Sequence, residues 1–169
     1  MTVSADEGAL DILAVQVGAR LKAKGLMIAT AESCTGGWVG QALTAIAGSS
    51  DYYERGFITY SNAAKQELLR VPAATLRDFG AVSEETARAM AAGTLANSHA
   101  QIALSITGVA GPGGGTEKNP VGTVCFGWAV KGDPSGAGSA RMLFAGDREV
   151  VRRQSVIFAL QGVLQRLEH

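Results

Sequence analysis

Apolar and polar residues alternate along the chain with two different periods, which predicts helices that alternate with short strands. Four apolar residues near the start fall on one face of a helix: Leu10, Leu13, Val17 and Leu21. We expect this helix to end at Gly25, after which a short apolar run over residues 26–31 indicates a buried strand. The chain then passes through residues 32–37 into a second helix, which we expect to reach about Ala47.

The same patterns place the remaining elements. We expect further strands over four segments: 53–60, 102–106, 122–130 and 140–144. We expect further helices over four segments: 61–69, 72–80, 83–98 and 147–167. Three of these four helices have an evident N-cap residue, which is Ser61, Ser83 or Asp147. Early alternation followed by a hairpin-like strand pair predicts one α/β domain over residues 1–169, a three-layer α/β/α sandwich with a mixed, mostly parallel sheet.

The composition fits this interpretation and argues against several other classes of protein. Of the 169 residues, 47% are hydrophobic and 18% are charged, which favours a globular interior over disorder. The formal net charge is zero, which argues against binding of nucleic acid, and no apolar run is long enough to span a membrane. Cys34 and Cys125 form no disulfide framework, so we expect a cytoplasmic protein. The His, Cys, Asp and Glu residues do not have the spacing that is typical of metal ligands, so we expect neither a metal nor another cofactor.

Small and hydroxyl-bearing residues gather after three of the expected strands, over residues 33–37, 60–61 and 107–115. In open α/β sheets, ligands bind at the carboxyl ends of strands near a change in strand order. If these three strand ends lie side by side, they form one pocket. We therefore expect the functional residues of this protein in these three segments.

Ser33 stands between the first strand and the second helix, where a tight turn can present a side chain. The backbone amides of Cys34, Thr35, Gly36 and Gly37 would then point from the start of the helix toward a bound anion or a developing oxyanion. Ser33 is therefore a candidate nucleophile, and the two glycines would let the backbone approach a ligand. The same pattern also fits a capping serine with glycines for packing. Cys34 is a rival nucleophile, because a thiol near a helix N-terminus can react readily.

A serine nucleophile needs a base, and neither histidine, His99 or His169, lies near a glycine-rich strand end. Lys65 is the better candidate, because it falls in the first turn of the short helix that follows the second strand. The helix dipole disfavours an ammonium ion there, and burial would lower the pKa of Lys65 in the same direction. A neutral amine could then accept the Ser33 proton. An exposed surface lysine is the alternative interpretation.

Two features could hold an anionic group. The glycine-rich run over residues 108–115, which includes Gly108, Gly111 and Gly113, could wrap a phosphate or act as a lid. It has neither the P-loop pattern nor the dinucleotide-binding spacing, and a flexible surface loop explains it equally well. Arg148 falls in the first turn of the last helix, where a cation is unfavourable unless an anion lies nearby. A salt bridge from Arg148 to a neighbouring carboxylate is the ordinary alternative.

Six segments together resemble a known family. They read TAESCTGGWVG, GFITYSNAAKQELL, GAVSEETARAMAAG, SITGVAGPGGG, VGTVCFGWA and FAGDREVVRRQSV. In this order they are similar to the CinA C-terminal domain family, which includes the nicotinamide-nucleotide amidohydrolases. The resemblance runs from about Ala9 to Leu164, which is nearly the whole chain.

The resemblance implies an activity and a set of site residues. The activity would be hydrolysis of nicotinamide mononucleotide to nicotinic acid mononucleotide and ammonia, in pyridine-nucleotide recycling. Ser33 and Lys65 match the family's Ser-Lys pair, and Tyr60 and Thr107 match pocket positions beside that pair. The family's three-layer α/β/α fold with a mixed sheet agrees with the fold expected from the hydrophobic pattern.

Our working hypothesis is an acyl-enzyme mechanism in which neutral Lys65 takes the Ser33 proton and Ser33 attacks the carboxamide. We expect Tyr60 and Thr107 to orient Lys65 and Ser33 by hydrogen bonding, and Arg148 or the glycine-rich run to hold the phosphate. Two alternatives stay open: a nucleotide-binding or regulatory module without catalysis, and a hydrolase of another small amide. The expected partner is a small nucleotide, and the sequence leaves a homo-oligomer open.

Overall fold

The computed structural model describes residues 7–168, and within them five strands form one sheet in the order β2-β1-β3-β4-β5. The strands are β1 (Ile28–Glu32), β2 (Tyr53–Ile58), β3 (Ile102–Gly108), β4 (Thr123–Val130) and β5 (Gly138–Leu143). Strand β1 pairs in parallel with β2 and β3, while β4 is antiparallel to both β3 and β5. Four of these five strands therefore run in the same direction, and the prediction of a mixed, mostly parallel sheet is confirmed.

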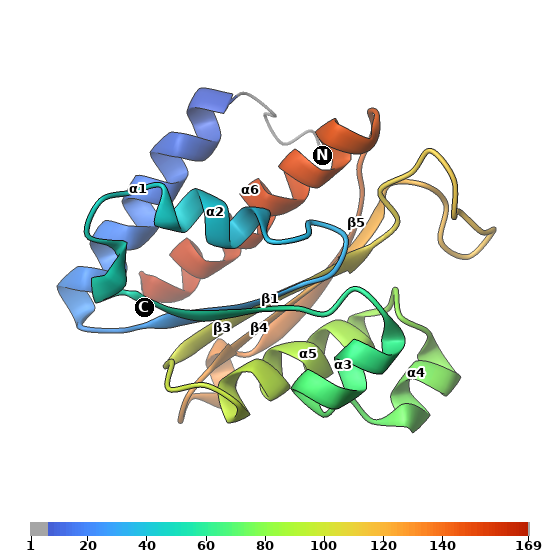
Figure 1. Cartoon of the computed structure of the whole chain (residues 1–169), viewed down its shortest axis with the longest axis horizontal. Coiled ribbons are helices and arrows are strands. Elements are labelled where there is room, and N and C mark those ends of the chain that lie inside the picture. Colours follow the sequence, from blue (N-terminus) through green and yellow to red (C-terminus); the bar gives the residue numbers. More distant parts are fainter. Residues whose placement is uncertain (1–6, 169) are drawn as a thin grey trace.

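Helices cover both faces of this sheet and make the three expected layers (Figure 1). One face carries α1 (Glu7–Lys24), α2 (Trp38–Thr44) and α6 (Arg148–Leu167). The other face carries α3 (Asn62–Leu69), α4 (Ala73–Phe79) and α5 (Glu84–Ala96). Two short 3₁₀ turns, Ser49–Asp51 and Pro134–Gly136, lie in the connections before β2 and β5. The expected three-layer α/β/α sandwich is thus confirmed.

The predicted N-caps are present, and one predicted helix is too long. The side chains of Ser61, Ser83 and Asp147 each accept a hydrogen bond from the backbone amide three residues later. Helix α2 ends at Thr44 rather than near Ala47. Beyond Ala45, the backbone bonds shift to the tighter three-residue spacing, which leads into the 3₁₀ turn and ends the helix.

The larger hydrophobic core lies between the sheet and the layer of α1, α2 and α6. Aromatic rings dominate the part beneath α6, where the ring centroids of Phe126 and Phe158 are 4.6 Å apart. The indole nitrogen of Trp128 donates to the carbonyl of Ala159 at 3.0 Å, so the ring is buried with its polar atom satisfied. Gly162 allows this approach, because a Cβ there would come within 2.3 Å of the Trp128 ring. The fit between α6 and β4 therefore leaves no room for a side chain at this position.

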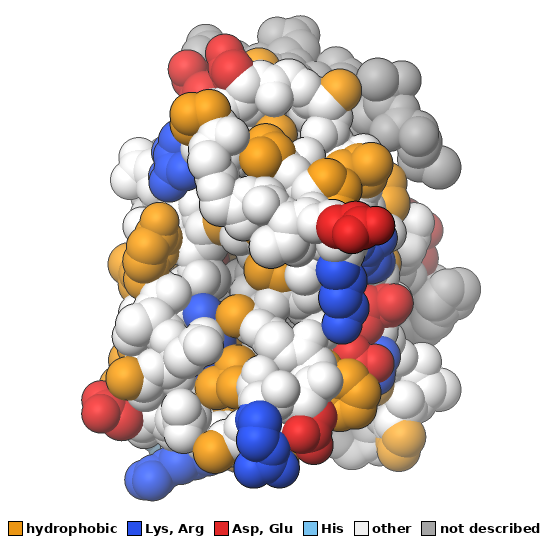
Figure 2. All heavy atoms as spheres, turned by 90° about the vertical axis from the view of Figure 1, so that its right-hand side faces the viewer, with side chains coloured by type: hydrophobic (Ala, Val, Ile, Leu, Met, Phe, Trp, Pro, Cys, Tyr) orange, Lys and Arg blue, Asp and Glu red, His pale blue; other side chains and the backbone are white. Residues whose placement is uncertain are grey.

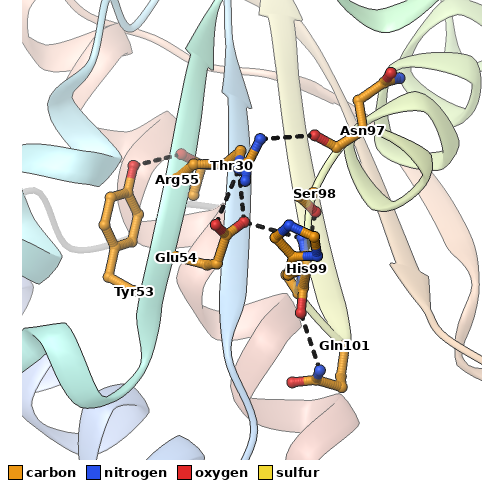
Figure 3. A network of polar contacts seen from close by, with 9 residues as sticks. Thr30, Tyr53, Glu54, Arg55, Asn97, Ser98, His99 and Gln101 are labelled. Atoms are coloured by element: carbon orange, nitrogen blue, oxygen red, sulfur yellow. Dashed lines mark hydrogen bonds and ion pairs between the residues drawn. The ribbon is translucent and has the colours of Figure 1, made fainter.

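A polar network ties the amino-terminal ends of β2 and β3 together (Figure 3). The carboxylate of Glu54 accepts from the Arg55 side chain at 2.7 Å and from the His99 backbone amide at 3.1 Å. Arg55 also donates to the carbonyl of Asn97 at 3.2 Å. His99 therefore belongs to the end of the sheet opposite the glycine-rich segments, as its sequence position suggested.

The order of the strands brings three loops together at the carboxyl end of the sheet. From β1 the chain crosses through α2 to β2 on one side, and it then crosses through α3, α4 and α5 to β3 on the other side. The carboxyl end of β1 thus lies where the strand order reverses, which is the usual ligand position in open α/β sheets. Because β1, β2 and β3 are parallel neighbours, the three segments rich in small and hydroxyl residues share this edge, as predicted.

Candidate active site

A pocket of about 200 Å³ opens at the carboxyl ends of β1, β2 and β3. Eleven residues line it: Ser33, Cys34, Tyr60, Asn62, Lys65, Ala81, Val82, Thr107, Gly108, Ala110 and Arg148. Figure 2 faces this side of the molecule, where hydrophobic and basic side chains surround a hollow. The lining draws on all three predicted segments and on the starts of α3 and α6.

Ser33 directly follows β1 and is held by the backbone of the neighbouring strand. Its amide donates to the carbonyl of Ile106 at 3.0 Å, which extends the pairing of β1 with β3 by one residue. The Gly36 amide then donates to the Ser33 carbonyl at 3.1 Å and closes a tight turn. Ser33 is buried, and its hydroxyl lies in the pocket wall. The turn therefore presents Ser33 as predicted.

Lys65 is buried beside Ser33. It lies in the first turn of α3 and is only 1% exposed. Its Nζ is 3.2 Å from the Ser33 hydroxyl, 3.0 Å from the Thr59 carbonyl and 3.3 Å from the Tyr60 carbonyl. No carboxylate of residues 7–168 forms a salt bridge with Lys65. The exposed-surface interpretation of this lysine is therefore wrong.

The surroundings of Lys65 favour the neutral amine. Burial lowers the pKa of Lys65 below its ordinary 10.5, and the nearby Cys34 acts in the opposite direction but less. A neutral amine has two N–H groups and one lone pair. In the structure Lys65 donates to the carbonyls of Thr59 and Tyr60 and to the Ser33 hydroxyl, and that hydroxyl donates to the Tyr60 carbonyl at 3.4 Å. A neutral amine that keeps its two bonds to the carbonyls would turn its lone pair toward the Ser33 hydroxyl. The contact geometry thus suits proton transfer from Ser33 to Lys65.

Cys34 is poorly suited to act as the nucleophile. The residue lines the pocket but is itself buried, and burial raises the pKa of its thiol to about 12, against a smaller lowering by Arg152. The thiolate that would attack a substrate is therefore scarce at neutral pH. This finding weighs against the rival nucleophile of the sequence analysis.

Glu32 occupies the N-terminus of α2 and engages helix amides that follow the expected donors at residues 34–37. Its buried carboxylate accepts from the Thr35 hydroxyl at 2.6 Å and from the backbone amides of Val39 and Gly40 at 2.9 and 3.2 Å. These first amides of the helix are therefore unavailable to a ligand. Sequence reasoning missed Glu32, although an acidic residue just ahead of a helix start is the signal for such a cap.

Three of the expected substrate-binding residues form the turn rather than the pocket. The hydroxyl of Thr35 bonds to Glu32, and Gly36 and Gly37 have φ angles of 62° and 109°. A Cβ at Gly37 would lie 3.2 Å from the side chain of Ile58, so both backbone angle and packing require glycine there. The side chain of Thr35 and the two glycines are not part of the pocket lining.

Tyr60 and Thr107 lie at the pocket, but their hydroxyls do not orient the Ser33–Lys65 pair. Tyr60 follows β2 with its carbonyl turned toward Lys65 and its side chain 64% exposed. The Thr107 hydroxyl donates to the carbonyl of Ala81 at 2.8 Å and so ties the end of β3 to the loop before α5. The expected hydrogen bonds from these two hydroxyls to Ser33 and Lys65 are thus absent, and the backbone of Tyr60 makes the contact instead.

Arg148 and the glycine-rich run, which the sequence analysis treated as alternatives, lie together. The Arg148 guanidinium donates to the carbonyl of Gly111 at 2.7 Å, and no carboxylate of residues 7–168 forms a salt bridge with it. Gly108 lines the same pocket as Arg148. Gly113 does not line the pocket, and a Cβ on it would meet no atom within 4 Å. The alternative interpretation of Arg148, a salt bridge to a neighbouring carboxylate, is therefore wrong for residues 7–168.

The described residues contain neither a metal-binding group of side chains nor a membrane-spanning helix. Among residues 7–168, no group of three or more His, Cys, Asp or Glu side chains is arranged to hold a metal ion. None of the helices there is both long and apolar enough to cross a membrane.

The fold and the pocket together define a class of protein: an α/β/α sandwich with a buried serine and lysine in contact where the strand order reverses. The profile of the CinA C-terminal domain matches residues 10–167, and the chain belongs to this family.

Two relatives share about half of their residues with this chain over nearly their whole length. The nicotinamide-nucleotide amidohydrolase PncC of Enterobacter agglomerans is 51% identical, over 94% of this chain and 96% of its own. The protein of the same name from Escherichia coli K12 is also 51% identical, over 91% and 92% of the two chains. A crystal structure of the competence/damage inducible protein CihA from Agrobacterium tumefaciens covers all of both chains, with 40% identity and a TM-score of 0.92.

Proposed function

We propose that this protein is a nicotinamide-nucleotide amidohydrolase that uses Ser33 as nucleophile and Lys65 as base. The observation that carries the mechanism is the 3.2 Å contact between the Ser33 hydroxyl and a buried, uncompensated Lys65 amine. The names and the identity of the two PncC relatives support the substrate, nicotinamide mononucleotide.

The reaction proceeds through an acyl-enzyme. The Ser33 hydroxyl passes its proton to neutral Lys65 while its oxygen bonds to the carboxamide carbon, and the carbonyl oxygen becomes an oxyanion. When the tetrahedral adduct collapses, the C–N bond breaks and protonated Lys65 gives its proton to the departing ammonia. A water then attacks the acyl carbon and loses a proton to Lys65. When this second adduct collapses, the bond between the acyl carbon and the Ser33 oxygen breaks, protonated Lys65 returns its proton to that oxygen, and nicotinic acid mononucleotide leaves.

The size of the pocket indicates where the two ends of the substrate bind. About 200 Å³ is below the roughly 300–1,000 Å³ of ordinary small-molecule sites, so a whole nucleotide extends beyond the Ser33 pocket. A second hollow shares Ala110 and Arg148 with it and continues past Pro112 and Val121. We assign the carboxamide to the Ser33 side and the phosphate to Arg148, whose charge no carboxylate of residues 7–168 pairs.

The proposal includes the setting of the reaction. The substrate is a small nucleotide, and the chemistry requires no metal or other cofactor. Cys34 and Cys125 are unpaired and buried, which agrees with a reducing compartment, so we assign the protein to the cytoplasm.

The first test is release of ammonia from nicotinamide mononucleotide by the wild-type protein and by Ser33→Ala, with a chelator present. We expect turnover by the wild type alone, with a rate that rises with pH as Lys65 loses its proton, since burial lowers the pKa of this group. Retained activity in Ser33→Ala would remove Ser33 from the mechanism. Binding of the nucleotide without turnover, unchanged in Ser33→Ala, would instead support a binding module, and turnover of only another amide would change the substrate.

A further inference from the structure

The side chain of Arg152 on α6 forms hydrogen bonds with the turn that carries Ser33. Its Nε donates to the carbonyl of Cys34 at 3.0 Å, and its Nη2 donates to the carbonyl of Thr35 at 3.1 Å. The planar guanidinium thus engages two consecutive carbonyls with two N–H groups whose directions are fixed relative to each other, whereas both bonds of an ammonium group would start from one freely rotating nitrogen. Its Cζ also lies 5.4 Å from the ring centroid of Trp38, which keeps it over the start of α2. Arg152 therefore fixes the orientation of two peptide planes next to Ser33.

Fixing these carbonyls also fixes an N–H group. Among residues 7–168 the only cis peptide bond is Gly111-Pro112, so the bond between Cys34 and Thr35 is trans. In a planar trans peptide, the N–H points opposite to the C=O. Because the Cys34 carbonyl faces Arg152, the Thr35 amide faces the other way. Within the described chain, this amide donates to no acceptor.

Several other amides near Ser33 are already engaged. Glu32 accepts from Val39 and Gly40, and the Gly36 amide closes the turn on the Ser33 carbonyl. The helix N-terminus therefore supplies no donor to an oxyanion on the Ser33 adduct. Within residues 7–168 the amides of Cys34, Thr35 and Gly37 donate to no acceptor, and Arg152 fixes the peptide that carries the Thr35 amide.

We propose that Arg152 is a positioning residue that holds the peptide between Cys34 and Thr35 so that the Thr35 N–H receives the oxyanion of the Ser33 adduct. The proposal rests on the proposed function, because it needs Ser33 as the nucleophile. Arg152 itself touches neither substrate nor reacting atoms. Its loss lets the peptide rotate, which weakens a donor that acts mainly in the transition state.

The experiment compares Arg152→Met and Arg152→Lys with Arg153→Met as the matched control. Arg153 lies over the same Trp38 ring at 5.1 Å but bonds to Glu149 rather than to the Ser33 turn. Two rates are measured: ammonia release from nicotinamide mononucleotide, and labelling of Ser33 by a fluorophosphonate, located by peptide mass spectrometry. The second rate depends on nucleophile and oxyanion donors but not on the natural substrate.

We expect Arg152→Met to lower kcat and the labelling rate by about 10- to 100-fold, somewhat less than loss of a whole oxyanion donor. KM and the pH midpoint of the rate should stay close to those of the wild type, because substrate binding and Lys65 are untouched. Arg152→Lys keeps the charge but loses the paired hydrogen bonds to the two carbonyls. Its kcat and labelling rate should therefore fall at least about threefold. Arg153→Met should behave as the wild type.

Labelling of Arg152→Met at the wild-type rate would overturn the proposal, and so would a loss that appears in KM alone. If circular dichroism shows that Arg152→Met does not fold, Arg152→Lys decides: slowed labelling supports the positioning role, and the wild-type rate overturns it. Wild-type protein that is labelled at Ser33 but releases no ammonia refutes the substrate, and the labelling rates still decide the role of Arg152. Wild-type protein that is not labelled at Ser33 overturns both.

Discussion

The amine of Lys65 is removed from water without a counter-charge. It is 1% exposed, and its three hydrogen-bond contacts are to two carbonyls and one hydroxyl, none of them charged. In the unfolded chain, the same amine is solvated and keeps its ordinary pKa of 10.5. The two states therefore bind different numbers of protons over a range of pH, and the stability of the protein must depend on pH there.

The sign of this dependence gives a first prediction. Between the lowered pKa of folded Lys65 and 10.5, the unfolded chain holds one more proton at this position, so stability rises with pH across that window. We expect Lys65→Met to remove this rise and to increase the free energy of unfolding at neutral pH, because an apolar chain needs no desolvation of charge. Urea unfolding over a pH series measures it. Lys24→Met, at an exposed end of α1, is the control and should retain the wild-type slope.

The two cysteines support a second prediction at the same scale. Burial raises the pKa of Cys34 to about 12 and that of Cys125 to about 11, so both are thiols at neutral pH. We expect iodoacetamide to modify neither residue appreciably at pH 7 in the folded protein, and both to react once urea unfolds the chain. Mass spectrometry of labelled peptides measures this. Rapid modification of Cys34 in the folded protein would restore it as a rival nucleophile.

Helix α2 starts on a carboxylate instead of a capping hydroxyl. Glu32 lies at the end of β1 and accepts from the amides of Val39 and Gly40 as well as from Thr35, so one buried side chain joins strand, turn and helix. The negative charge also lies where the helix dipole favours it. The geometry of the Ser33 turn thus depends on the residue that precedes it.

A third prediction follows for this element. Glu32→Gln replaces one accepting oxygen by an NH₂ group, which leaves at least one helix amide without a partner. We expect the free energy of unfolding to fall by about 1–3 kcal/mol, the usual cost of an unpaired buried polar group. The ammonia-release rate should fall as well, because the turn loses its anchor. Glu67→Gln on the exposed face of α3 is the control in urea unfolding, and equal stability of both variants would contradict this role of Glu32.

Elements and site differ in how far the sequence could predict them. The strands and helices were predictable because hydrophobic periodicity and N-caps such as Ser61 are local signals. The clearest error in these predictions is the end of α2. The positions of Ser33 and Lys65 at element boundaries made them candidates only, and the family resemblance was needed to prefer them over a capping serine and an exposed lysine. The hydrogen bond from Arg152 to Cys34 was not predictable, since it joins residues 118 positions apart and depends on how α6 packs. The orientation of the Thr107 hydroxyl likewise follows from the loop packed against it.

At the scale of the whole molecule, the layer of α1, α2 and α6 is pressed closely on the sheet. Gly162 is the closest point of this contact, where the Trp128 ring lies against the backbone of α6. Arg166 lies over the same ring, with its guanidinium 4.4 Å from the ring centroid. The packing of α6 on the sheet therefore has no space for a side chain at position 162.

The fourth prediction tests this fit. Alanine forms helices better than glycine by about 1 kcal/mol, yet a Cβ at position 162 would lie 2.3 Å from the Trp128 ring. We expect Gly162→Ala to lower the free energy of unfolding by a net amount of about 1–2 kcal/mol, because overpacking outweighs the gain in propensity. Urea unfolding measures it, with Gln161→Ala at the neighbouring exposed position as control. A more stable Gly162→Ala protein would show that the layers can separate slightly at no cost.

The pocket takes residues from Ser33 near the first strand and from Arg148 at the start of α6, the last helix of the described chain. A chain still growing on the ribosome therefore carries Ser33 and Lys65 long before it can close the pocket. The contact that holds the Ser33 turn also comes from α6. The pocket is consequently complete only after α6 has been synthesised, and chains that lack α6 should be inert toward nucleotides.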